Sequence, residues 1–316
     1  MSTLKNAAGR LLRVLPGEGR AVKIALRRAL AHKERMIGRA KQRLAGAWLP
    51  DARTVFHIDP RRIEFATCLD SGSADWEDWV LPQKGRVEPV RGGEWDALVH
   101  RVAEMRICRA VQARIAQGAD WSSTEYYRTA VGQIESGRVL WGCASRADFD
   151  AHCTRVDGLI DSIRRDGYRA AAELPDQGHA DTATGQTEVL VNLSRDGLPL
   201  FQDGRHRLAI ALALGLPTIA VQVFVRHAQW QAFREYLLRM AGREDGGASS
   251  AGFLYQRAEH FDLAEIPAAH GCEDRWQSIA PHLPTSAHGR ALDIGCNLGF
   301  ICHRLEERGY SAYGVE

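Results

Sequence analysis

The chain has 316 residues, of which 45% are hydrophobic and 25% are charged, so it has the composition of a globular protein and the length of two ordinary domains. It contains no run of roughly 18 apolar residues that could span a membrane, and its first residues lack a signal-peptide pattern. The seven cysteines include no C-x-x-C pair and no Cys/His cluster at zinc spacing. We therefore expect a cytoplasmic protein with reduced thiols and no metal site.

The formal net charge of +2 is distributed unevenly along the chain. Residues 1–50 contain twelve Lys/Arg and two acidic residues, whereas the remaining residues contain 29 basic and 37 acidic groups. Residues 19–47 place apolar side chains near one helical face and basic side chains over the rest. This pattern predicts a basic amphipathic arm that binds an anionic membrane surface peripherally, or nucleic acid. The alternative is a helix that packs on the next domain or stays in water.

The first elements after the arm are short. Residues 54–65 read as a strand, a turn at Pro60 and the start of a helix. Residues 94–172 have mostly helical spacing, and the last helix of this predicted insert ends at Gly167. Aromatic residues are frequent between residues 121 and 143, which is more typical of a core than of a ligand cage.

The next segment predicts a strand-rich region. Alternating apolar and polar residues over 188–194 indicate a half-buried strand. The elements expected after it are a tight turn at 195–197, a strand at 198–202, a helix at 205–215 and a strand at 218–227. Residues 241–252 are polar and rich in Gly and Ser, so they mark the best domain boundary.

The sequence DGRHR at residues 203–207 predicts an anion site. Gly204 falls at a strand-to-helix turn, where a backbone without Cβ can approach a ligand closely. Arg205, His206 and Arg207 follow at the helix N-terminus, which already carries a partial positive charge. Such a cluster is destabilising unless an anion or a nearby carboxylate offsets it. The alternative is an ordinary helix that Asp203 caps, with the arginines in water.

Residues 187–227 resemble the core of the ParB/sulfiredoxin fold, and residues 57–65 resemble its first strand and turn. The resemblance implies that Gly204, Arg205, His206 and Arg207 contact nucleotide phosphates, with ATP or CTP and Mg²⁺ as the expected ligands. Sulfiredoxin-like members carry a reactive Cys where this chain has Arg205, so sulfinic-acid reductase activity is not expected. Members that segregate DNA use further helix-turn-helix domains, which the later residues do not indicate, so we expect no specific DNA reading.

Some members of this fold phosphorylate small molecules with an acid near the first turn. Glu64 is the local candidate for that catalytic acid, and a solvated residue is the alternative.

The C-terminal residues form a second motif. Ala291–Ile294 read as a buried strand, Gly295 and Gly299 frame a turn into a helix, and a second strand ends at Glu316. This arrangement resembles motif I of the Rossmann-like methyltransferases that use S-adenosylmethionine. The resemblance implies that Asp293, Gly295 and Gly299 shape the cofactor site, Asn297 approaches the cofactor, and Glu316 binds its ribose. Asn297 replaces the middle glycine of a dinucleotide fingerprint, which is tolerable because S-adenosylmethionine has no pyrophosphate.

A single βαβ unit cannot bury both faces of a parallel sheet. We therefore expect residues 290–316 to be the first part of a longer domain, without methyltransferase activity by themselves. The predicted fold class is an α+β ParB/sulfiredoxin-like domain followed by an incomplete α/β Rossmann-like domain. The predicted organisation is an arm at 1–50, the α+β domain at 51–245, a linker and lead-in at 246–289, and the methyltransferase start at 290–316.

The predicted function is an S-adenosylmethionine-dependent methyltransferase fused to a domain that binds a nucleotide or phosphate. One alternative is a regulatory module that senses a nucleotide, is tethered by the arm and has no methyltransferase activity. A second is a small-molecule kinase built on the DGRHR turn.

Overall fold

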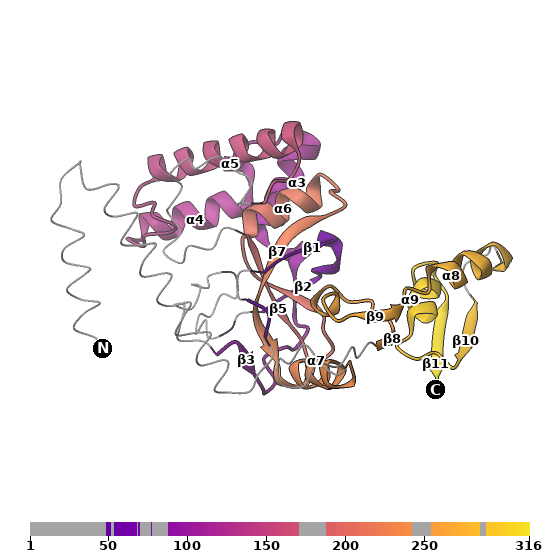
Figure 1. The fold of residues 1–316 in the computed structure, drawn as a ribbon. Coiled ribbons are helices and arrows are strands. Elements are labelled where there is room, and N and C mark those ends of the chain that lie inside the picture. Colours follow the sequence, from indigo (N-terminus) through magenta and orange to yellow (C-terminus); the bar gives the residue numbers. More distant parts are fainter. Residues whose placement is uncertain are drawn as a thin grey trace, which may run out of the picture. The chain divides into compact units, whose positions relative to one another are not determined.

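The computed structural model describes residues 49–51, 54–67, 69, 77, 88–170, 188–241, 254–284 and 289–316. All of them except 49–51 belong to one compact unit, Ala52–Glu316. The predicted arm and the Gly/Ser-rich segment lie almost wholly outside the described residues. Within the described part the fold is mixed α and β (Figure 1), and none of its helices is long and apolar enough to cross a membrane.

Seven of the described strands form a mixed sheet in the order β1-β7-β5-β6-β2-β4, with β3 also paired to β7. Strand β5 runs parallel to β7 and antiparallel to β6, so it lies in the interior of the sheet. The strands of this sheet are β1 (Val55–Ile58), β2 (Phe65–Ala66), β3 (Val90–Arg91), β4 (His100–Arg101), β5 (Val189–Leu193), β6 (Pro199–Asp203) and β7 (Ile219–His227).

The prediction of a half-buried β5 is wrong, because both of its faces are buried. The alternation arose from polar residues that are withdrawn from water but hydrogen-bonded. Asn192 donates to Thr67 Oγ1 at 2.7 Å and to Gln202 Oε1 at 2.6 Å, and it accepts from the backbone N–H of Val225 at 3.1 Å. These bonds link β5 to β6, to β7 and to the residue that follows β2, so a polar side chain helps to fix the register of a buried sheet.

Helices α3 to α6 pack together on one side of the sheet (Figure 1), with α6 against β5, α3 and α5 against α6, and α4 against α3 and α5. The tight turn at 195–197, the strands before and after it, and the helix that ends at Gly167 are confirmed. The α-helices of this region are α3 (Arg106–Gln117), α4 (Glu125–Glu135), α5 (Arg146–Asp166), α6 (Arg205–Ala213) and α7 (Ala228–Met240). The 3-10 helices are η2 (Pro60–Arg62), η3 (Val102–Glu104) and η4 (Trp121–Ser123).

Two of the predicted helical regions do not begin where the sequence pattern placed them. Residues 94–105 have helical spacing but form turns, β4 and η3, because β4 pairs antiparallel with β2. That strand pairing overrides the local helical pattern. Similarly, the helix expected near Pro60 is only the short η2, which Asp59 caps, and the chain then enters β2.

The segment after α7 contributes to the core through a buried ion pair. The carboxylate of Asp262 is fully buried and pairs with Arg226 of β7. It also accepts from Trp230 Nε1 of α7 at 3.0 Å. Buried charges are found where they are paired and hydrogen-bonded, as here. The elements of this segment are β8 (Leu254–Gln256), η6 (Phe261–Leu263), β9 (Ala268–His270), α8 (Glu273–Ile279) and η7 (Ala280–His282).

The C-terminal residues form the predicted strand, turn, helix and strand, with β10 (Arg290–Ile294) parallel to β11 (Ser311–Val315) and α9 (Phe300–Glu306) between them in sequence. The prediction that β10 is buried is wrong, because Leu292 is 62% exposed and Ile294 79% exposed. In the described part of the chain, these two strands pair only with each other. One face of this two-stranded sheet therefore remains in solvent.

An ion pair joins the turn of the β5–β6 hairpin to the loop between β3 and β4. Arg195 donates to the carboxylate of Asp96 through its backbone N–H at 2.8 Å and through Nε at 2.9 Å. The Asp96 side chain is only 3% exposed, and Arg195 holds the pKa of this carboxyl at about 2. Because the pKa in the folded state is depressed, the pair stabilises the fold above the pKa of the unfolded chain. That stabilisation is lost as the pH falls from about 4 through about 2.

We expect Asp96→Asn to lower the free energy of unfolding at pH 7 by about 1–2 kcal/mol, a range discounted for the partial exposure of Arg195. Urea titrations at several pH values measure this difference, which should shrink towards pH 2 as the wild-type carboxylate is protonated. Glu94→Gln removes the exposed partner of the same arginine and is the control with little effect. A difference between Asp96→Asn and wild type that does not change with pH would contradict the ion pair.

Candidate functional site

The DGRHR turn depends on a glycine in a left-handed conformation. Gly204 has φ 90° and ψ 31° and is the N-cap of α6. A Cβ at this position would lie 3.0 Å from the Cα of Val189, so the turn passes directly against β5. Asp203 is the last residue of β6 rather than the cap, and its Oδ1 accepts from the backbone N–H of Gly204 at 2.7 Å. The alternative in which Asp203 caps the helix is therefore wrong.

The three basic residues after Gly204 contact three different sets of neighbours. Arg205 Nη1 donates to the backbone carbonyl of Glu77 at 3.1 Å, and its guanidinium lies 5.2 Å from the centre of the Trp141 ring. Arg207 Nη1 lies 3.7 Å from the buried carboxylate of Glu188. The positive charge at this helix N-terminus is thus partly offset by a carboxylate of the chain itself.

His206 packs into a cluster of aromatic rings. Its Nε2 lies 3.1 Å from Tyr126 Oη and 3.3 Å from His152 Nε2, and Tyr126 Oη is 3.4 Å from His152 Nε2. Phe149 stacks on the His152 ring with centroids 5.5 Å apart. Burial lowers the pKa of His152 to about 4 and holds the pKa of His206 well below its usual value, so both rings are neutral at pH 7.

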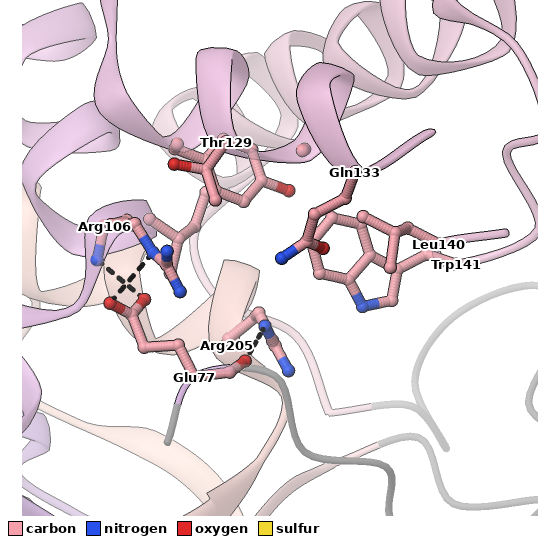
Figure 2. A pocket seen from close by; sticks show the side chains of 10 residues that line it. Glu77, Arg106, Thr129, Gln133, Leu140, Trp141 and Arg205 are labelled. Carbon is pink, nitrogen blue, oxygen red and sulfur yellow. Dashed lines mark hydrogen bonds and ion pairs between the residues drawn. The ribbon is translucent and has the colours of Figure 1, made fainter. Parts of the chain in front are cut away.

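A pocket adjoins this cluster on the side of Arg205 (Figure 2). Its cavity is small, with a volume of about 20 Å³, and it opens to solvent. Figure 2 shows Arg106, Thr129, Gln133 and Arg205 around this space. Its other lining residues are Glu77, Ile107, Tyr126, Ala130, Leu140 and Trp141.

Charge and polarity suit this pocket to a small anion. Arg106 is paired with Glu77, with Nε 3.1 Å from Oε1. Among the described residues that line the pocket, two guanidinium groups and one carboxylate leave a net positive charge, and the Gln133 amide lies beside them. Guanidinium groups are the side chains best matched to carboxylate and phosphate.

Trp141 is exceptional among the aromatic residues of the insert. The core assignment is confirmed for Trp121, Tyr126 and Tyr127, which are at most 9% exposed. Trp141 is 42% exposed, and it has φ 49°, a left-handed value that bulky residues rarely adopt. Backbone strain of this kind clusters at functional sites. The sequence gives no sign that the pocket residues of α3 and α4 lie beside Arg205, because 72 to 99 residues separate them from Arg205 along the chain.

Glu64, the candidate catalytic acid, lies between η2 and β2 with a side chain that is 64% exposed. Its carboxylate approaches Arg101 Nη1 at 3.9 Å, and its backbone carbonyl accepts from Val102. These contacts are typical of a surface residue at a strand edge, so the catalytic role of Glu64 stays a prediction.

The structure brings four of the five residues of the C-terminal motif to one turn. Gly295 and Gly299 have φ values of 78° and 77°, and Asn297 between them has φ 49°. The backbone N–H of Asn297 donates to Glu316 Oε2 at 2.7 Å. Asp293 lies one strand position away from the turn, and its Oδ2 faces Cys302 Sγ of α9 at 3.8 Å. The turn after one strand and the acid after the neighbouring strand are thus in hydrogen-bond contact.

Comparison of the chain with protein-family models, with curated proteins and with solved structures found no match. The described residues also contain no group of three or more His, Cys, Asp and Glu side chains arranged to hold a metal ion. The functional assignments therefore depend on the geometry above and on the motifs of the sequence.

We expect Gly204→Ala to lower the melting temperature, because alanine would have to adopt φ near 90° while its Cβ meets β5. The left-handed conformation alone costs about 1–2 kcal/mol, and the clash adds to that cost. Gly215→Ala is the matched control, since Gly215 has φ 64° but open space where the Cβ would lie. Equal losses of melting temperature in the two variants would show that the approach to Val189 contributes nothing.

Proposed function

We propose that residues 290–316 begin a Rossmann-like methyltransferase domain that binds S-adenosylmethionine, and that the preceding α+β domain binds a small anion such as a nucleotide phosphate. The observation that carries the first part is the contact between the Asn297 N–H and the Glu316 carboxylate at 2.7 Å. It joins a glycine-framed turn to an acid at the carboxyl ends of two parallel strands, where open α/β sheets bind their ligands.

Each residue of the motif has a role in this proposal. Gly295 and Gly299 allow the left-handed backbone of the turn, and no atom lies within 4 Å of the place that a Cβ at Gly295 would take. The Glu316 carboxylate accepts hydrogen bonds from the ribose hydroxyls, and Asn297 lies beside it. The cofactor supplies an electrophilic methyl group on a sulfonium, while the protein supplies orientation and electrostatics.

We expect the 316-residue chain to bind S-adenosylhomocysteine weakly, with saturation transfer to its ribose and adenine protons in ligand-observed NMR. Glu316→Gln should weaken binding by about 10–100-fold, because a charged acceptor is lost from the ribose contact. Glu306→Gln, on the exposed side of α9, is the control that keeps binding. Equal binding by Glu316→Gln and wild type would contradict the role of this acid.

A separate observation favours the anion-binding function of the preceding domain. Arg106 of the insert and Arg205 of the DGRHR turn line one pocket, together with Gln133 and Trp141. Because Arg205 lines this pocket, we favour it as the residue that contacts the phosphate. His206 and Arg207 then have supporting roles, because His206 is neutral in the aromatic cluster and Arg207 faces Glu188. The ParB/sulfiredoxin-like pattern of the motif supports the same class of ligand.

Calorimetric titration with ATP, CTP and pyrophosphate tests this function. We expect Arg205→Gln and Arg106→Gln each to weaken binding by about tenfold or more, because each removes a charge-assisted hydrogen bond. Arg109→Gln is the control on the same helix, since Arg109 is exposed and pairs with Glu125. Absence of binding of all three ligands to the wild type would refute the proposal, and Mg²⁺-dependent ATP turnover that Glu64→Gln abolishes would favour the kinase alternative.

A further inference from the structure

Three side-chain atoms from three helices form a nearly equilateral triangle. They are Tyr126 Oη of α4, His152 Nε2 of α5 and His206 Nε2 of α6, and the edges of the triangle are 3.1, 3.3 and 3.4 Å. Tyr126 and His152 belong to the helical insert, whereas His206 belongs to the DGRHR turn. Neither the proposed cofactor turn nor the anion pocket requires this arrangement.

Hydrogen bonding accounts for only two edges of the triangle. An imidazole nitrogen carries either a proton or an in-plane lone pair, and the tyrosine hydroxyl has one proton to donate. If one histidine carries its proton on Nε2, this proton and the tyrosine proton form two hydrogen bonds, and the third edge has none. If both histidines carry a proton on Nε2, their N–H groups face each other across the third edge. If neither histidine does, the tyrosine proton forms the one hydrogen bond of the triangle.

A metal ion inside the triangle accounts for all three edges. Zinc binds imidazole nitrogen at about 2.0–2.1 Å, so two ligand atoms at the tetrahedral angle lie about 3.3–3.4 Å apart. We propose that Tyr126 Oη, His152 Nε2 and His206 Nε2 are three protein ligands of a divalent transition-metal site that ties the insert to the start of α6. Two imidazoles favour an ion of the zinc class over Mg²⁺ or Ca²⁺, which prefer oxygen ligands.

Metal binding also changes the charge of the triangle. A bound cation favours the phenolate, so binding releases one proton from Tyr126 to solvent. The negative charge of the phenolate offsets part of the repulsion between the ion and the nearby Arg155 and Arg205.

The aromatic neighbours hold the ligands in place. Phe149 and Trp141 stack on the His152 ring with interplanar angles of 18° and 20°. Tyr126 is 5% exposed, so its ring has little freedom to move away from the two histidines. In metal sites, neighbouring side chains typically hold the ligand side chains in the orientation that binding requires.

The test uses the full chain, produced without a histidine tag, stripped with a chelator and titrated with Zn²⁺ against a chromophoric competitor. We expect one equivalent of Zn²⁺ to bind and the melting temperature to rise. Tyr126→Phe keeps the ring and removes only the ligand oxygen, and His152→Gln removes one nitrogen. Each should weaken binding by at least about tenfold, whereas the exposed-residue control His282→Gln should not.

Co²⁺ gives an independent readout, because a tetrahedral site produces visible absorption that should disappear in Tyr126→Phe. Circular dichroism checks that each variant is folded, and if one is not, the other makes the same comparison. Absence of stoichiometric Zn²⁺ binding to the wild type would overturn the proposal. Zn²⁺ binding that both ligand variants retain would also overturn it, since the ion would then lie elsewhere on the chain. Neither outcome would bear on the cofactor turn or the anion pocket.

Discussion

The candidate site of the α+β domain depends on how closely the chain passes β5 at Gly204. The backbone of this turn lies so near Val189 that even a methyl group has to displace it. This contact fixes where α6 begins and which way its first residues face. Arg205 then reaches the pocket, His206 enters the aromatic cluster and Arg207 approaches Glu188. Three consecutive basic residues thereby acquire three different environments.

The helical insert completes this region. Helices α3 and α4 provide Arg106 and Gln133 to the pocket, and α4 and α5 provide Tyr126 and His152 to the triangle. Tyr126 belongs to both, because it lines the pocket and contacts His206. A displacement of α4 relative to α6 would therefore alter the pocket and the triangle together. The insert and the DGRHR turn form one structural unit even though they lie far apart in the sequence.

The geometry of the C-terminal turn is set by local backbone conformation, with three left-handed residues between β10 and α9. The N–H groups of Gly295 and Cys296 donate to the carbonyl of Val315, and this holds the turn against the end of β11. Glu316 is consequently placed beside the turn by the parallel pairing of the two strands. The exposed face of Leu292 and Ile294 is what a two-stranded sheet leaves when α9 covers only its other face.

The sequence by itself determined the elements whose signals are local. Glycine positions predicted the turns at Gly204, Gly295 and Gly299, and apolar periodicity predicted β7, α5, α6 and the order of strands and helix at the C-terminus. The tertiary structure alone decided which side chains meet. Tyr126, His152 and His206 are separated by up to 80 residues, and only the packing of three helices brings their polar atoms within 3.4 Å. It also decided the burial of β5 and the exposure of β10, because burial depends on which elements cover a strand rather than on the strand's own residues.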